Sequence, residues 1–566
     1  MKTRNKLYDK SRLRLLCLLT ALLGLFGAGQ TWAGNPTTLT VGGTNVQSGG
    51  YWTTDESGTL TADGASAENY NVYYDGNGTL TLKDATINGT NTIGHVGAGI
   101  FASGDLTIVL EGSSTVKGVQ DPNGETQSIR VEENLTIQGG GSLTAQGAET
   151  SSGSSYGIFV IGSFTQQGGS VTASGGNVSG NYNSTGLYVY GSTVTVQGGT
   201  LTATGGTTGS GSYGISANGS VTVSDATVTA TGGTGKYSYG LYVSSNSPSV
   251  TLSDSGSLTA RSGSATSKAS GIYFQNPFGS TGSVTVGDNS TLLANSVIRQ
   301  DINVDQYPLA PTGNGSWLIY GQSNQPSAVG GTYTLEENIT IPSGAVVTIP
   351  AGSTLTIPED KTLTADANQL VVNGELVLEG TFDNAKELEG SGNLVLGEIT
   401  LTDDEGIGAY EGYQLKLKSK KVTYTRALSD NSQYGTICLP FVPTSVAGGQ
   451  VTYYQVEKLG SNEITLVEID FEAGKPLFYR TSGTGSITFS AESAAGVELV
   501  TTPATDNFMV GTMSEVIPTT GYFLKNNNFY PITDGVQVKV KSFRAYVKGQ
   551  NDASQASVMS VNVARP

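Results

Sequence analysis

The sequence predicts an all-β protein: a right-handed parallel β-helix followed by a C-terminal antiparallel β-sandwich. Three observations lead to this prediction. Glycine is abundant, with 79 glycines among 566 residues, and many of the glycines recur at regular intervals. Short runs of alternating Val, Ile, Leu and Thr lie between them, which is the period of half-buried strands. The repeating part of the chain contains no helical segment.

Residues 1–33 resemble an export signal and are set aside from the fold. Basic residues precede a short apolar run from Leu13 to Phe26, and Ala33 ends a cleavage motif of small residues. The run is too short for a spanning helix, and we expect no transmembrane span in the mature chain. The protein is therefore expected at the outer surface, outside the cell, or in the periplasm. One cysteine, Cys438, remains after cleavage, so no disulfide is expected to stabilise the fold.

The charge balance excludes some classes of function. The chain has a net charge of −17 and a single histidine. Because an acidic, Arg-poor chain does not neutralise phosphates, nucleic acid is not an expected partner. The single histidine disfavours His-rich metal sites and His-based catalysis.

Repeats fill the chain from about residue 70 to 300. A small residue followed by Ile or Leu recurs at steps of 26 to 31 residues, at Gly99, Ser128, Gly157, Gly186, Gly214, Gly240 and Gly271. Each repeat carries two more short strands, such as 192–196 and 200–203 in the fourth. Three short strands without a helix predict one coil of a parallel β-helix per repeat. We expect the β-helix over 34–300, with 37–70 capping its N-terminal end.

The remainder is predicted in three parts. Residues 301–331 are irregular and are expected to form a linker or a lateral excursion. In 332–400, Pro342, Pro350 and Pro358 recur between short strands, which predicts a second solenoid that continues or caps the first. Over 401–566 the strands lengthen and charged residues become more frequent, which predicts a separate β-sandwich.

The first strand of each repeat contains the candidate binding residues. If the residue after the small anchor points inward, the next one points outward. That outward position is aromatic in five of seven repeats, and Tyr190, Tyr156, Tyr213 and Tyr239 lie beside it. Aromatic rings stack on the apolar faces of sugars, and exposed aromatics are normally scattered. We therefore expect a glycan to bind at Phe101, Arg130, Phe159, Tyr188, Tyr190, Tyr242 and Tyr273. The alternative is that the rings only stabilise the sheet, or that a loop or the C-terminal domain covers them.

A second column suggests calcium. Asp225, Asp254 and Asp288 follow the second strands of three successive repeats, and Asp84 and Glu111 hold similar places. Carboxylates on neighbouring coils repel one another, and a Ca²⁺ ion would relieve this repulsion. The alternative is that these are turn residues that cap backbone amides.

Catalysis is not supported by the sequence. Only Arg130 among the bases of the repeats lies on the aromatic column, and Glu132 and Glu133 alternate across a strand. A glycosidase needs two carboxylates facing one substrate. A polysaccharide lyase or hydrolase therefore remains an alternative, as does a structural or adhesive rod that contacts a host or cell-surface protein.

Two segments resemble known families. The runs 78–87, 99–100, 106–112 and 141–145 resemble secreted carbohydrate-binding β-helix proteins of anaerobic bacteria with a pectate-lyase-like fold. That resemblance implies binding of polygalacturonate and calcium without a clear catalytic apparatus. The runs 422–426, 434–441, 473–476 and 543–546 resemble a β-domain that ends many surface proteins of gut and oral anaerobes with an outer membrane. The sequence thus predicts an exported, non-catalytic carbohydrate-binding surface protein.

Overall fold

The computed structural model describes residues 34–90, 97–120, 124–275, 282–301, 304–321, 326–428, 433–460, 463–533, 537–549 and 558–563. The chain divides into two compact units. Unit 1 comprises Met1–Thr285 and Ile298–Leu309, and unit 2 comprises Val286–Val297 and Ala310–Pro566. The predicted export signal lies outside the described residues. No helix in the described part of the chain is long and apolar enough to cross a membrane.

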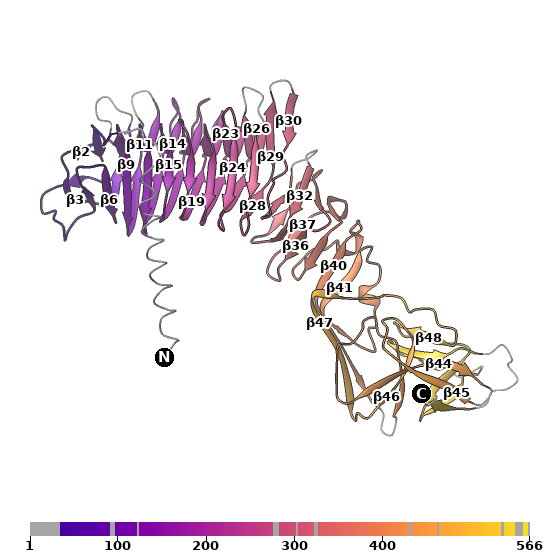
Figure 1. Ribbon diagram of the computed structural model, residues 1–566. Coiled ribbons are helices and arrows are strands. Elements are labelled where there is room, and N and C mark those ends of the chain that lie inside the picture. The colour runs from indigo at the N-terminus through magenta and orange to yellow at the C-terminus, as the bar shows by residue number, and fades with distance from the viewer. Residues whose placement is uncertain are drawn as a thin grey trace, which may run out of the picture. The chain divides into compact units, whose positions relative to one another are not determined.

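Unit 1 is a parallel β-solenoid, as the repeats predict (Figure 1). Each coil contributes one strand to each of three sheets, and the strands of successive coils pair in parallel register. Six full coils run from β8 to β25, and β26 opens the next. The first sheet contains β8 (Ile100–Ala102), β11 (Thr126–Val131), β14 (Ser155–Val160), β17 (Ser184–Val189), β20 (Gly211–Ala217), β23 (Gly235–Ser244) and β26 (Ala265–Gln275).

The other two sheets complete each coil. The second sheet contains β9 (Leu106–Glu111), β12 (Leu135–Gly139), β15 (Phe164–Gln166), β18 (Val194–Val196), β21 (Val221–Ser224) and β24 (Ser249–Ser253). The third contains β10 (Ser113–Lys117), β13 (Ser142–Gln146), β16 (Ser170–Ser174), β19 (Gly199–Thr204), β22 (Ala226–Thr231) and β25 (Ser257–Arg261).

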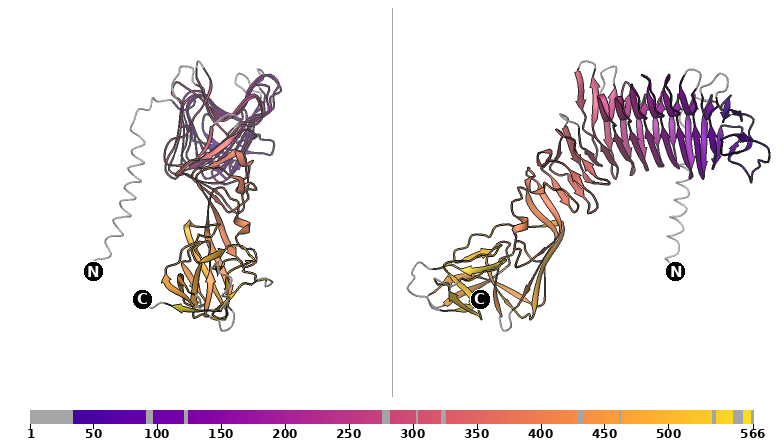
Figure 2. Two further views of the ribbon diagram at one scale, coloured as in Figure 1. Left: turned by 90° about the vertical axis from the view of Figure 1, so that its right-hand side faces the viewer. Right: turned by 180° about the vertical axis from the view of Figure 1, so that it is seen from behind.

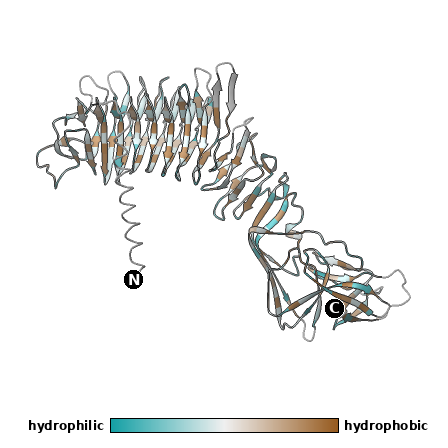
Figure 3. Cartoon of the chain, viewed as in Figure 1, coloured by the Kyte–Doolittle hydropathy of each residue, from teal (hydrophilic) through white to brown (hydrophobic). Residues whose placement is uncertain are grey.

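The core of unit 1 is a set of aligned apolar side chains. In the first sheet the residue after each anchor pairs with its equivalent on the next coil and is fully buried, which confirms its predicted inward direction: Ile100, Ile129, Ile158, Leu187, Ile215, Leu241 and Ile272. Burying each such side chain stabilises the fold by roughly 1.5–3 kcal/mol. Figure 3 shows the hydrophobic positions recurring along the stacked strands.

Antiparallel strands lie at both ends of unit 1. At the N-terminal end β1 (Leu39–Val41) pairs antiparallel with β8, and β3 (Gly50–Thr54), β5 (Val72–Tyr74) and β6 (Thr79–Lys83) pair antiparallel in turn. At the other end of the first sheet, β29 (Val297–Asp301) and β30 (Val304–Pro308) form an antiparallel pair. Residues 301–331, which were predicted to form a linker or a lateral excursion, therefore begin within β29.

Unit 2 begins as a short-strand solenoid. Strands β33 (Thr332–Thr334), β36 (Thr354–Ile357), β39 (Glu375–Leu378) and β40 (Asn393–Leu401) pair in parallel. The same sheet continues through β41 (Lys416–Ala427), where Leu401 lies opposite Tyr424, and then pairs antiparallel with β47 (Ser486–Glu498). One hydrophobic core runs from Leu293 to Phe543. The sheet and the core therefore both cross the change in composition at residue 401.

In the last part of unit 2, the described residues form a largely antiparallel sheet of nine strands. It contains β42 (Tyr434–Ile437), β46 (Leu477–Thr481), β44 (Val451–Leu459), β45 (Glu463–Ile469), β52 (Met559–Val563), β50 (Asn528–Pro531), β49 (Tyr522–Lys525), β51 (Arg544–Val547) and β48 (Met509–Thr512), in that order. Within it, β45 and β52 pair in parallel. Figure 2 shows these strands at the yellow end of the chain.

Candidate binding site

The outward residues of the first sheet of unit 1 form the candidate site. The predicted column is in register along the whole sheet, because each member lies opposite the next on the neighbouring strand. We call it the first column: Phe101, Arg130, Phe159, Tyr188, Ser216, Tyr242 and Tyr273.

A second column runs beside the first, three residues earlier in each strand. It consists of Gln127, Tyr156, Thr185, Tyr213, Tyr239 and Ser270, again paired strand to strand. Where one column lacks a ring, the other supplies it. On β17 the second column has Thr185 but the first has Tyr188, and on β20 the first column has Ser216 but the second has Tyr213. Within the first sheet, each of the strands β14, β17, β20, β23 and β26 therefore carries at least one ring in these two columns. We call the surface formed by the two columns the aromatic face.

Glycine accounts for the spacing of the two columns. Between Tyr156 and Phe159 lie Gly157 and Ile158, and the strand pairing skips Gly157. A Cβ atom on Gly157 would lie 2.6 Å from the amide nitrogen of Ser174 on β16 of the same coil. Because glycine has no side chain, the first strand can pack closely against the third strand of the same coil. Gly157 and Ile158 then both face inward, while the rings before and after them, Tyr156 and Phe159, both face outward.

The rings form two contacting groups. In the first, the ring centroids of Tyr156, Phe159 and Tyr188 lie 5.2–5.4 Å apart, and Tyr190 lies 6.4 Å from Tyr188. The guanidinium of Arg130 lies 5.2 Å from the centroid of Phe159, within cation–π distance.

The second group consists of four tyrosine rings and contains the shortest ring contact of the face. Tyr239 and Tyr273 stack with centroids 4.4 Å apart, Tyr242 lies 5.8 Å from Tyr239, and Tyr213 lies 5.2 Å from Tyr242. Burial raises the pKa of Tyr213, and neighbouring hydroxyls, those of Tyr156 and Tyr188 among them, raise it further.

The exposure of the first column differs from the prediction at its ends. Phe101 is 2% exposed and Tyr273 is 3% exposed, so neither presents a free ring. Tyr273 is buried because it packs against Tyr239 and Ile298. The strand of Phe101 pairs with the N-terminal β1. Both are therefore corrected from outward platforms to packed side chains.

The middle of the aromatic face remains accessible. Arg130, Phe159, Tyr188, Tyr213 and Tyr242 are half-buried. Tyr190 is 56% exposed, whereas Tyr156 and Tyr239 are buried beneath their neighbours. The accessible part of the predicted site therefore lies between Arg130 and Tyr242.

The face also offers hydrogen-bonding groups. Burial raises the pKa of Tyr156 to about 12 and raises the pKa values of Tyr188 and Tyr242, so these hydroxyls stay protonated at neutral pH and can donate. Arg130 Nη2 lies 3.2 Å from Glu132 Oε1.

Two buried polar groups of the second column were missed in the sequence. Gln127 Oε1 and Thr185 Oγ1 form no hydrogen bond with the described residues, and the same holds for Arg130 Nε in the first column. In the sequence, only their alignment with the tyrosines of neighbouring repeats could have identified these two residues, because Gln and Thr are common in the repeats.

The aspartates predicted to bind calcium behave as turn residues. Asp84, Asp225 and Asp254 have left-handed backbones, with φ of 49°, 46° and 50°. Aspartate tolerates this conformation better than most residues. The amide of Asp225 donates to the carbonyl of Asp254 at 2.9 Å, so these two turns are adjacent, whereas Asp288 belongs to unit 2. In the described part of the chain no three His, Cys, Asp or Glu side chains cluster as metal ligands do. Calcium binding stays a prediction.

Comparisons with known proteins do not assign the chain to a family. No protein-family model and no curated protein matches it. Among solved structures, a double mutant of the tailspike protein of E. coli bacteriophage HK620 is similar to this chain at 10% sequence identity, over 83% of this chain and 85% of the tailspike chain. The TM-score of that comparison is 0.18, which is too low to support any argument.

Proposed function

We propose that the protein is a non-catalytic carbohydrate-binding surface protein, in which a glycan chain lies along the aromatic face of the solenoid. The main support is the strand-by-strand register of the two columns, which lines up rings parallel to the stacking direction of the coils. Coils stack at roughly 4.8 Å, so the accessible rings recur along a straight path. Such a path suits an extended polymer better than a compact ligand.

The proposed contacts combine stacking with hydrogen bonds. Phe159, Tyr188 and Tyr242 are half-buried and offer ring surface for the apolar faces of sugars. Tyrosine hydroxyls and the Arg130 guanidinium offer donors to sugar hydroxyls.

The experiment that tests this proposal is a screen of the full chain on a glycan array, followed by affinity electrophoresis in gels containing the glycans that bind. We expect migration to be retarded for the wild-type chain and restored by Tyr188→Ala combined with Tyr242→Ala, because both remove half-buried rings. The matched control is Tyr51→Ala combined with Tyr73→Ala. These rings stack 4.5 Å apart on β3 and β5, outside the first sheet.

Three outcomes contradict the proposal. One is that no glycan on the array binds, and another is that both double variants lose binding equally. The third is release of reducing or unsaturated sugar from a bound glycan, which contradicts the non-catalytic part of the proposal.

A structural or adhesive rod is the second candidate function. The close stacking and burial of Tyr239 and Tyr273 favour it, since buried rings stabilise a sheet whether or not a ligand binds. This candidate predicts adhesion to a cell-surface or matrix protein without glycan binding.

A further inference from the structure

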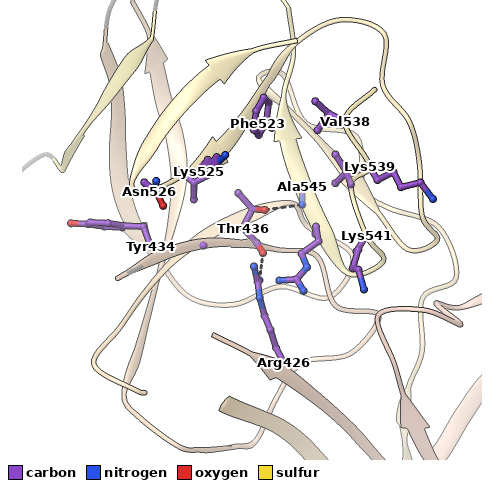
Figure 4. Close-up of a pocket in the computed structure, with 14 residues that line it drawn as sticks. Arg426, Tyr434, Thr436, Phe523, Lys525, Asn526, Val538, Lys539, Lys541 and Ala545 are labelled. Carbon is purple, nitrogen blue, oxygen red and sulfur yellow. Dashed lines mark hydrogen bonds between the residues drawn. The ribbon is translucent and has the colours of Figure 1, made fainter. Parts of the chain in front are cut away.

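A pocket of about 420 Å³ lies within unit 2, at the edge of the nine-stranded sheet (Figure 4). It is lined by residues of β41, β42, β49 and β51, by Asn526 and by the segment 538–541. Pockets that hold small molecules typically measure roughly 300–1,000 Å³. This pocket is therefore large enough for a ligand of about the size of one sugar.

The lining of this pocket is strongly basic. Among the described residues that line it, five are cationic and none is acidic; the cationic ones are Arg426, Lys525, Lys539, Lys541 and Arg544. The whole chain has the opposite balance, with 46 acidic and 29 basic residues. A cluster of cations at a concave surface concentrates the positive potential and attracts anions.

Two of the five cations have no acidic partner among the described residues. Lys525 is exposed at the end of β49 and forms no ion pair there. Arg426 donates from Nη1 to the carbonyl oxygen of Thr436, and its guanidinium lies 5.0 Å from the ring centroid of Tyr479. The ring and the carbonyl hold the guanidinium in place at the pocket wall, where its positive charge is not neutralised by a carboxylate.

The other three cations pair with acids that lie outside the lining. Lys539 Nζ lies 2.9 Å from Glu515 and Lys541 Nζ lies 2.9 Å from Asp404. These pairs involve exposed side chains and contribute little to stability, so a bound anion can compete for both lysines. Arg544 pairs with Asp403, which also accepts a hydrogen bond from the Tyr424 hydroxyl, so this arginine is held more firmly.

The cations come from several directions. In Figure 4 the side chain of Arg426 lies below Thr436, and Lys525 and Lys541 lie on opposite sides of Thr436. The amide of Ala545 on β51 donates to Thr436 Oγ1 on β42 at 3.1 Å and so links these two strands, which are not paired within the sheet. A planar carboxylate is satisfied by one guanidinium in its plane, whereas cations on several sides match the diverging oxygens of a tetrahedral oxyanion. Phe523 and Val538 add apolar surface for an organic body.

We propose that this pocket binds a phosphate or sulfate ester of a small organic molecule of sugar size. The proposal concerns unit 2 alone and does not depend on glycan binding by the aromatic face.

Isothermal titration calorimetry of the full chain tests the proposal. The probes are glucose 6-phosphate, glucose 6-sulfate, glucuronate, inorganic phosphate and glucose. We expect both esters to bind at one site per chain, more tightly than glucuronate and inorganic phosphate, and glucose not to bind. Binding of the esters should weaken as salt is added, because salt screens the exposed lysines.

The informative variant is Lys525→Gln, which removes an exposed cation without disturbing the core. We expect it to raise the dissociation constant of glucose 6-phosphate at least about fivefold, or roughly 1 kcal/mol. The matched control is Lys458→Gln, an exposed lysine on β44 that does not line the pocket, and we expect it to leave the constant unchanged.

Any of the following results overturns the proposal: neither ester binds, Lys458→Gln weakens binding as much as Lys525→Gln does, or glucuronate binds more tightly than both esters. If inorganic phosphate binds as tightly as glucose 6-phosphate, the sugar part of the ester does not contribute to binding, and the proposal of an organic ester is overturned.

Discussion

At the scale of single residues, the anchor glycines have the clearest structural role. On β17, a Cβ atom on Gly186 would lie 2.5–2.8 Å from three backbone atoms, on Ala173, Thr204 and Gly214. These atoms belong to strands of the preceding coil, the same coil and the next coil, so they cannot move away without disturbing the stack. The same close approach sets the spacing between Thr185 and Tyr188, and through it the position of both columns.

We predict that Gly186→Ala destabilises the solenoid by about 1–3 kcal/mol, the usual cost of overpacking a close contact. The measurement is urea unfolding followed by circular dichroism. Gly140→Ala is the control, because a Cβ atom there has nothing within 4 Å. Equal stability of the two variants would show that the close approach seen at Gly186 relaxes freely.

At the scale of elements, a ladder of buried serines connects the first strands to the loops that precede them. Ser184 Oγ donates to the carbonyl of Gly176 at 2.7 Å and accepts from the amide of Gly206 on the following coil at 2.7 Å. Ser212 repeats the pattern with Gly206 and Gly233. Each hydroxyl therefore satisfies two backbone groups and links one coil to the next.

Ser212→Ala tests this ladder. Losing the hydroxyl removes its hydrogen bonds to the half-buried carbonyl of Gly206 and the half-buried amide of Gly233, and each such bond contributes about 0.5–1.5 kcal/mol. We expect a lower thermal unfolding midpoint than for Ser179→Ala, an exposed loop serine used as the control. If the two variants have the same thermal unfolding midpoint, the serine ladder makes no measurable contribution to stability.

At the scale of the whole molecule, the sequence predicted the repeating part of the fold well and the remainder less well. The steps between the anchors predicted which residues stack, as the pairing of Ile100 with Ile129 shows. Strand pairing depends on the period alone in a solenoid, which explains this success. The change in composition at residue 401 carried no information on pairing, so the continuation of the sheet from β40 into β41 was not visible.

The candidate sites, too, were predictable only as far as the strand period determines the position of a residue. The strand period placed the aromatic column, but the burial of Tyr273 depends on how its ring packs against Tyr239 and Ile298. The basic pocket had no sequence signal, since its five cations are scattered between residues 426 and 544 and are brought together only by the sheet.

The central claim is that a glycan chain lies along the aromatic face, and an oligosaccharide length series tests it most directly. The glycan that binds best on the array is cut into oligomers from the dimer upwards, and the affinity of the full chain for each is measured by calorimetry. From Arg130 to Tyr242 the face crosses four coil steps, roughly 19 Å at 4.8 Å per step. We predict that affinity rises with each added sugar until the oligomer spans this length and then stays constant. A dimer that binds as tightly as the longest oligomer would contradict the claim, because it would locate the glycan at one compact site.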